Sequence, residues 1–172
     1  YTTKIEDVSN VLQRMEIIQR ISEVIKGYLI ELGKEGVIAS MRLRELTKNF
    51  NKEMELILMD YDVNYTVNDA EVKSALDKMS FDFLLDISNI SKLLFIEIHD
   101  RSISPRGFRI LSKTSLSETN INLLTNEFKS LNEIFDADKE VLIKVLKDEG
   151  VVILFMRNLD SLKEKIMEGK NI

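Results

Sequence analysis

Apolar residues recur at intervals of three and four along most of the chain, which is the pattern of amphipathic helices. The first run, from Asp7 to Leu32, predicts a helix about 38 Å long at about 1.5 Å per residue. Asp7 or Ser9 can cap its start, and Gly33 stands where a left-handed C-terminal cap belongs. We therefore expect one long, uninterrupted helix at the beginning of the chain.

A second apolar stripe covers residues 37–61, after a short break that contains Gly33 and Gly36. Its members step by three or four residues and are Ala39, Leu43, Leu46, Phe50, Met54, Ile57 and Tyr61. Two long stripes with a short break between them predict an antiparallel helical hairpin. One face of the second helix should then be buried, and the residues expected on that face include Leu43, Leu46, Phe50 and Ile57.

Shorter stripes complete the helical pattern. We expect a connector at residues 62–68, a helix at 69–78 and, after a Ser80 cap, a helix at 81–95. Periodicity is lost over residues 96–105, which hold the only proline, so the domain boundary is predicted there. Shorter helices are expected at about residues 106–113, 119–128, 131–135, 138–146 and 150–167. The pattern predicts an all-α protein, with a long antiparallel hairpin or bundle in residues 1–104 and a small helical domain in residues 105–172.

Composition supports this fold class and removes several kinds of chemistry. One Pro and six Gly among 172 residues leave few points at which helices break. Cys is absent and His99 is the single histidine, which excludes disulfides, cysteine nucleophiles and zinc sites built from Cys or several His. No apolar run approaches the roughly 18 residues that span a bilayer, and no signal segment opens the chain, so we expect a cytoplasmic protein without a membrane partner. Because the chain begins at Tyr1, we expect it to be a fragment of a longer protein.

Acidic side chains are concentrated in the first part of the chain. Residues 1–104 carry 13 basic and 18 acidic side chains, whereas residues 105–172 carry 11 of each. Nucleic-acid-binding domains are usually basic, because neutralisation of phosphates supplies most of their affinity. The charge therefore argues against DNA binding by residues 1–104. Residues 105–172 could bind DNA only through a local basic patch.

The titratable residues do not form a catalytic centre. His99 stands alone, with Glu97 and Asp100 nearby in sequence, and since a catalytic site needs several converging groups, we interpret it as a surface or boundary residue. The acidic pairs Glu53/Glu55 and Asp60/Asp62 splay to different helix faces and are interpreted as solvated charges. Neither a glycine-rich phosphate loop nor a Gly-x-Ser-x-Gly elbow occurs. We expect no enzyme activity, no metal site and no cofactor.

Two arginines lie at the predicted domain boundary. Arg106 and Gly107 follow Pro105, and Arg109 comes two residues later. The guanidinium groups could bind phosphate, whose geometry they match in a bidentate manner. We favour the alternative of a clasp, in which Arg106 or Arg109 pairs with an acidic residue of the N-terminal part, because arginines near a domain junction more often pair with carboxylates. Arg106, Gly107 and Arg109 are thus candidate junction or phosphate-binding residues.

Residues 128–142 carry the most specific pattern: an aromatic residue, then Ser-Leu-x-x-Ile-x-x-Ala, then four residues and Leu. This outline is typical of the middle of tandem helix-hairpin-helix domains, which bind DNA backbones. There a Gly-x-Gly hairpin directs backbone N–H groups toward a phosphate at a helix N-terminus. Here the hairpin is expected after Val145, where Asp148 and Glu149 precede a single glycine, Gly150. The first hairpin, near residues 114–117, lacks its glycines as well.

The candidate DNA-contacting residues lie in and around these two turns. They are Thr114, Ser115, Ser117, Lys144, Lys147, Gly150 and Lys163. The lysines could offset the two carboxylates in part if they lie on the same side. We therefore expect weak DNA binding.

Taken in order, these segments resemble the DisA family of DNA-integrity scanning proteins, which are bacterial diadenylate cyclases, over the C-terminal two-thirds of those proteins. The best-matching segments are residues 7–21, 28–36, 59–61, 83–86 and 105–111. They include a Glu-Leu-Gly-x-Glu-Gly run and a Pro-Arg-Gly-aromatic-Arg-x-Leu run. Each run is a modest motif, but the two together, in this order and spacing, are fairly specific.

The resemblance implies a function as well as a fold. Residues 1 to about 100 would be a helical linker, and residues from about 105 would form a helix-hairpin-helix-like (RuvA domain 2-like) module that senses branched DNA in DNA-damage surveillance. A cyclase domain with Asp-Gly-Ala and Arg-His-Arg motifs would lie upstream. Neither motif occurs in this sequence, so condensation of ATP to cyclic di-AMP is not expected of this chain.

The leading prediction is therefore a non-catalytic regulatory segment. Its expected partners are DNA, the upstream cyclase domain and further copies of itself in a homo-oligomer. One alternative is a structural or oligomerisation module that has lost DNA binding, which the neutral charge of residues 105–172 favours. Another is an unrelated helical adaptor, since long apolar stripes also bind partner helices.

Overall fold

A computed structural model of the chain describes residues 3–61, 69–95 and 102–168, and most of these residues are helical. The all-α prediction is confirmed. Apart from the turns that join the helices, the described ranges contain two short strands, β1 (Thr3–Lys4) and β2 (Ser102–Ile103), which pair in one small sheet. The expected connector at 62–68 and His99 fall outside the described residues.

The chain divides into two compact units. One contains residues 3–58 and 62–102, and the other contains residues 1–2, 59–61 and 103–172. The assignment of residues 1–104 to a linker and of residues 105–172 to a helix-hairpin-helix-like domain stays a prediction.

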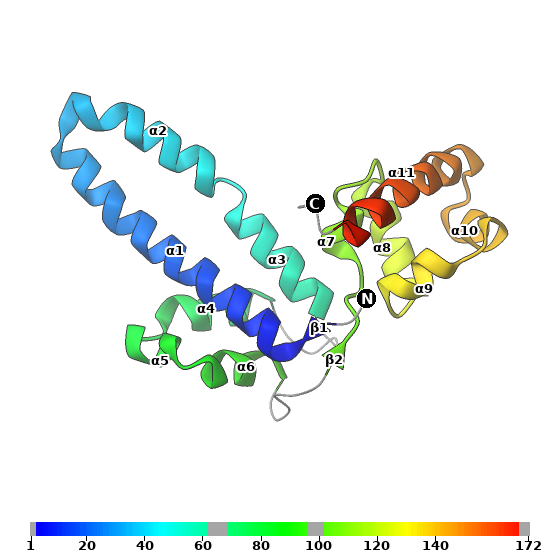
Figure 1. Ribbon diagram of the computed structural model, residues 1–172, viewed down its shortest axis with the longest axis horizontal. Coiled ribbons are helices and arrows are strands. Elements are labelled where there is room, and N and C mark those ends of the chain that lie inside the picture. The colour runs from blue at the N-terminus through cyan, green and yellow to red at the C-terminus, as the bar shows by residue number, and fades with distance from the viewer. Residues whose placement is uncertain (1–2, 62–68, 96–101, 169–172) are drawn as a thin grey trace. The chain divides into compact units, whose positions relative to one another are not determined.

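The N-terminal unit is built on a helical hairpin. Helix α1 (Ile5–Glu31) leads through the short η1 turn (Gly33–Glu35) into α2 (Gly36–Thr47), and α2 returns along α1 (Figure 1). Gly33 has φ +59°, so the left-handed residue predicted at this helix end is confirmed.

The start and the second arm of the hairpin differ from the prediction. Helix α1 begins at Ile5 after an Lys4 cap, so the expected cap at Asp7 or Ser9 is wrong. Ser9 lies inside the helix, where its hydroxyl donates to the Ile5 carbonyl at 2.9 Å.

The second arm is two helices, because α2 ends at Thr47 and α3 (Phe50–Tyr61) begins after a break. The Thr47 hydroxyl donates to the carbonyl four residues earlier, a bond that commonly bends helices.

The expected buried seam along this second arm is only partly present. Ile57 is buried, Leu43 and Phe50 are half-buried, and Leu46 is 73% exposed. The prediction is therefore wrong for Leu46 and incomplete for Leu43 and Phe50. The physical reason is that the apolar core collects at the α3 end of this arm, around Met54 and Ile57, whereas the least exposed position of α2 is a glycine, Gly36.

Three shorter helices pack beside the first half of α1: α4 (Asp69–Lys78), α5 (Phe81–Leu85) and α6 (Ile87–Phe95). The Ser80 cap is confirmed, since its hydroxyl accepts the Phe83 N–H. The single helix predicted at 81–95 is wrong, because Asp86 is extended and its carboxylate accepts the Ser88 N–H at 3.0 Å, which starts a new helix.

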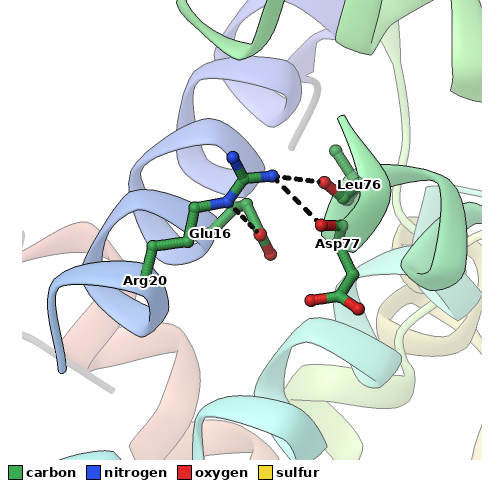
Figure 2. Close-up of polar contacts among 4 residues, drawn as sticks. All are labelled: Glu16, Arg20, Leu76 and Asp77. Atoms are coloured by element: carbon green, nitrogen blue, oxygen red, sulfur yellow. Dashed lines mark hydrogen bonds and ion pairs between the residues drawn. The ribbon is translucent and has the colours of Figure 1, made fainter. Parts of the chain in front are cut away.

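A polar clamp joins α1 to α4 within this unit. The Arg20 guanidinium donates to Glu16 at 2.8 Å and to the carbonyls of Leu76 at 2.7 Å and Asp77 at 3.4 Å (Figure 2). These carbonyls lie in the last turn of α4, where a cation also complements the helix dipole. The clamp pairs Glu16, which is only 3% exposed.

The C-terminal unit contains four short helices and one longer helix, all close to the predicted ranges. They are α7 (Phe108–Leu111), α8 (Glu118–Glu127), α9 (Leu131–Asp136), α10 (Lys139–Leu146) and α11 (Glu149–Met167). Serine caps start α8 and α9, where Ser117 accepts the Asn120 N–H and Ser130 accepts the Glu133 N–H. Leu111, Leu124, Leu142 and Phe155 are completely buried and form its apolar core.

Candidate nucleic-acid interface

Asp60, at the end of α3, fixes the beginning of the C-terminal helices. Its carboxylate accepts the Gly107 N–H at 2.9 Å and the Arg109 N–H at 3.1 Å. Its carbonyl accepts the Arg106 N–H at 3.0 Å. Asp60 is 4% exposed, so its interpretation as a solvated charge is wrong. The carboxylate instead satisfies backbone N–H groups at the first turn of α7, which have no partner within the helix.

The Pro-Arg-Gly segment is held by the same network. Gly107 has φ +118°, a conformation that favours glycine. The Arg106 guanidinium donates to the Thr125 carbonyl at 3.1 Å, and the Pro105 carbonyl accepts the Leu131 N–H at 2.8 Å. The Asp60 carboxylate thus binds this segment through the backbone N–H groups of Gly107 and Arg109. Phosphate binding by Arg106 or Arg109 stays a prediction.

Burial changes the acidity of Asp60. Desolvation raises the pKa of its carboxyl to about 6, against the lowering effect of the N–H donors of Arg109, Gly107 and Phe108. This acid therefore titrates in a pH range where exposed carboxylates stay ionised.

The first candidate turn, between α7 and α8, uses its polar side chains to hold its own shape. The Thr114 hydroxyl donates to the Leu111 carbonyl at 2.6 Å and accepts the Leu116 N–H at 3.2 Å. Ser117 caps α8, and the Ser115 hydroxyl accepts from the Asn158 amide of α11 at 2.9 Å. Ser115 and Ser117 are exposed, so a phosphate can reach them.

The second candidate turn, between α10 and α11, consists of Lys147 and Asp148. Lys147 has φ +56° and ends α10 in the left-handed conformation. Asp148 follows, and its carboxylate accepts the Val151 N–H at 3.0 Å. The acid thus occupies the N-terminus of α11, where a helix would offer its N–H groups to a phosphate.

Other charges surround this second turn. Glu149 pairs with Lys139 at 2.8 Å, and this ammonium holds the pKa of Glu149 below its usual value. Lys144 and Lys147 are exposed, as is Gly150 in the first turn of α11. The Lys163 ammonium instead donates to the Phe135 carbonyl at 3.0 Å and lies over the Phe135 ring.

The structure therefore brings some of the candidate residues together. Lys147 and Gly150 flank one turn, Thr114, Ser115 and Ser117 form the other, and Lys163 is turned toward α9. Sequence reasoning missed Asn158, which links the first turn to α11, and Lys139, which pairs with Glu149. Neither carries a local signal, since each partner lies at least ten residues away. The capping role of Asp148 could have been predicted from the sequence. Asp is a preferred N-cap residue, and the next residue, Glu149, is an acid of the kind that favours the first turn of a helix.

Within residues 3–61, 69–95 and 102–168, no three His, Cys, Asp or Glu side chains gather as a metal ion would require. No helix over the described part of the chain is both long and apolar enough to cross a bilayer.

Comparison with known proteins identifies the family. A family model described as the DisA bacterial checkpoint controller linker region matches residues 2–102. The chain is 34% identical over 177 residues to the DNA integrity scanning protein DisA of Clostridioides difficile, which covers 98% of this chain and 49% of that protein. The protein of the same name from Clostridium botulinum is 37% identical over 181 residues, covering 99% and 49%. The one from Acetivibrio thermocellus is 34% identical over 143 residues, covering 80% and 40%.

The chain spans about half the length of the first two of these relatives, rather than the two-thirds that we expected. The family model covers more than half of this chain, and the matched residues include the whole helical hairpin. We conclude that the chain belongs to the DisA linker family.

Proposed function

We propose that this chain is the non-catalytic regulatory segment of a DisA-type protein. In this proposal α7–α11 contact the DNA backbone, and α1–α6 connect that module to a cyclase domain in the parent protein, in the cytoplasm. The supporting observation is that two helix pairs, α7/α8 and α10/α11, are each joined by a short exposed turn that opens a helix N-terminus. Helix N-termini at such turns bind phosphates without reading sequence. The names of the relatives, DNA integrity scanning proteins, agree with a DNA partner.

The proposed contact is weak. A phosphate that approaches α11 meets the Asp148 carboxylate, which already accepts the Val151 N–H. Lys144 and Lys147 supply positive charge nearby, but Glu149 is exposed at the same turn. Since neutralisation of phosphates supplies most nonspecific affinity, this balance of charges favours binding at low salt only.

Titration of the chain with duplex DNA and with a four-way junction, each at low and at moderate salt, tests the proposal. We expect binding at low salt that is lost near physiological salt, and a preference for the junction if both turns engage. Charge reversal at Lys147 should weaken this binding. Charge reversal at Lys34, which is exposed at the hairpin tip of the other unit, is the matched control and should leave it unchanged.

A structural module without DNA binding is the second candidate function. It is favoured by one observation, the occupation of the α11 N-terminus by Asp148. Absence of binding to either DNA at low salt, with the helical circular dichroism signal intact, would favour this candidate over the first.

We also propose that the chain makes no cyclic dinucleotide. The Asp-Gly-Ala and Arg-His-Arg motifs of the resembled family do not occur in its sequence. Incubation with ATP and a divalent metal, followed by chromatography, should give no product above a buffer control.

A further inference from the structure

Four hydroxyl side chains lie at residues 112–117, where α7 ends and α8 begins, and two of them donate their proton within the turn. The Ser112 hydroxyl donates to the Arg109 carbonyl at 2.7 Å, and the Thr114 hydroxyl donates to the Leu111 carbonyl at 2.6 Å. Because a hydroxyl has a single proton, these two groups have none left for a ligand. The turn therefore offers a hydroxyl proton to a ligand only at its other two hydroxyls, Ser115 and Ser117.

Ser115 differs from its neighbours because a side chain of another helix binds it. Its oxygen accepts the Asn158 amide N–H at 2.9 Å. An amide nitrogen only donates, so the Ser115 proton must point to a different acceptor. None of the residues that the structure describes accepts this proton, and Ser115 is exposed, so a ligand from solution can accept it.

Asn158 provides a fixed anchor for Ser115. It lies on α11 between Phe155 and Leu159, which are 0% and 5% exposed and pack in the apolar core of the C-terminal unit. Ser115 lies in the turn between two helices, where the Asn158 amide is the group that its side chain binds. Asn158 therefore sets the direction in which the Ser115 proton points.

We infer that Asn158 is a positioning residue, which directs the Ser115 hydroxyl outward so that Ser115 donates its proton to a phosphate oxygen of the DNA backbone. The inference rests on the proposed function and identifies the side chains through which the first turn acts. A phosphodiester oxygen is an ionised acceptor, and hydrogen bonds to ionised acceptors are about twice as strong as those between neutral groups. Donation by Asn158 also polarises the Ser115 hydroxyl and makes it a better donor.

The second turn offers no equivalent donor. There the side chain at the N-terminus of α11 is the Asp148 carboxylate, which accepts the Val151 N–H and repels a phosphate. Hydroxyl donation at the first turn should therefore supply a measurable share of the DNA affinity. Because a hydroxyl carries no charge, its loss should lower the affinity without changing the slope of affinity against salt concentration.

Fluorescence anisotropy with labelled four-way-junction DNA at low salt tests the inference in a double-variant cycle. We expect Ser115→Ala and Asn158→Ala each to raise the dissociation constant about threefold to tenfold. The double variant should bind like Ser115→Ala, because Asn158 acts only through Ser115. Ser112→Ala is the matched control: it removes an exposed hydroxyl of the same turn whose proton already binds the Arg109 carbonyl, and it should leave the affinity unchanged.

Reversal of the polarity at residue 158 separates positioning from a structural role. Asn158→Asp keeps a hydrogen bond to Ser115 but accepts its proton, so the turn stays tethered while the phosphate loses its donor. This variant should bind DNA more weakly than Ser161→Asp, which adds the same charge at an exposed position one turn further along α11. Equal affinities of these two variants would show a structural role only and overturn the inference.

Stability and DNA affinity should also separate in Asn158→Ala. Alanine is a better helix former than asparagine, so thermal unfolding should show no loss of stability while the DNA affinity falls. Wild-type affinity in Ser115→Ala or Asn158→Ala, or losses that add in the double variant, overturn the inference and leave the proposed function standing. Absence of DNA binding by the wild-type chain overturns both.

Discussion

Asp60 precedes Gly107 by 47 residues, yet its carboxylate accepts the Gly107 N–H at 2.9 Å. The same carboxylate accepts the Arg109 N–H, so one buried acid organises the start of α7. An acid with this role in the fold links the stability of the C-terminal helices to pH.

The unfolding free energy should fall as the pH rises from about 4 to about 6. Burial raises the pKa of Asp60 from 3.8 to about 6, so the folded state holds the proton more tightly than the unfolded chain. The protonated Asp60 therefore stabilises the fold fully at pH values below its pKa in the unfolded chain. This stabilisation, about 3 kcal/mol in all, is lost as the pH rises through the pKa of Asp60 in the folded chain. Urea unfolding at pH 4 and pH 7 measures this loss. Asp60→Asn should remove it, whereas Asn at the exposed Asp160 should not; equal pH dependence in wild type and Asp60→Asn contradicts the prediction.

Removal of the Arg20 side chain should destabilise the N-terminal unit. Arg20→Ala leaves Glu16, which is 3% exposed, without its guanidinium partner and the last α4 carbonyls without a donor. We expect a loss of about 3 kcal/mol, because breaking one side of a buried ion pair leaves an uncompensated charge. Adding Glu16→Gln to Arg20→Ala should recover part of this loss in thermal unfolding. A double variant less stable than Arg20→Ala would show that the charge of Glu16 is not the cause.

The hairpin tip depends on Gly36. A Cβ there would lie 2.1 Å from the Leu29 carbonyl oxygen, so Gly36→Ala must push α2 away from α1, at a cost of about 1–3 kcal/mol. Gly27→Ala is the matched control, since nothing lies within 4 Å of its Cβ and alanine favours a helix by about 0.5–1 kcal/mol. The midpoint of chemical denaturation should therefore fall for Gly36→Ala and rise for Gly27→Ala. Midpoints that shift in the same direction would contradict the close approach of Gly36 to the Leu29 carbonyl.

Periodicity located the helices well where each one has its own local signals. The ranges of α8 to α11 follow from serine caps and from turns that interrupt the apolar stripes. The same method missed the break before Phe50 and the one at Asp86, because an apolar stripe can continue across two helices that only one or two residues separate.

Burial was harder to predict than helicity. Leu46 and Ile21 fit an apolar stripe as well as Ile57 does, but only Ile57 is buried within this chain. A stripe shows that a face prefers to be covered, not what covers it. Asp60 is the converse case, since the N–H groups that hold it lie 47 and 49 residues away and leave no trace in its local sequence.

The candidate site was predictable at the level of its turns but not of its contacts. The pattern placed one turn after Val145, and the structure has it at Lys147 and Asp148. The link between Ser115 and Asn158 depends on tertiary packing across 43 residues, which no spacing rule supplies.

Lys147→Gly should stabilise the C-terminal unit. Lys147 is the one described non-glycine residue with positive φ, at +56°, and a side chain in this conformation costs about 1 kcal/mol. The same substitution at Lys144, inside α10, should instead destabilise by about 1 kcal/mol, because glycine disfavours a helix. Unfolding midpoints that fall in both variants would contradict the left-handed geometry at Lys147.

Replacement of Asp148 and Glu149 by Gly or Lys should strengthen DNA binding. The Asp148 carboxylate repels phosphate and accepts the Val151 N–H, and Glu149 pairs with Lys139, so the substitutions remove two negative charges and release a donor and a cation at one helix N-terminus. A charge at a helix terminus contributes about 0.3–1 kcal/mol, so two should tighten binding about threefold to thirtyfold at low salt. Asp148→Asn with Glu149→Gln is the matched variant: it removes the same charges but keeps a capping side chain, and it should bind with intermediate affinity. Fluorescence anisotropy with labelled junction DNA measures the DNA affinity of the wild-type chain and of the two double variants, and so ranks the three. Weaker binding by the glycine variant, with its helical signal intact, would mean that these carboxylates do not face the DNA.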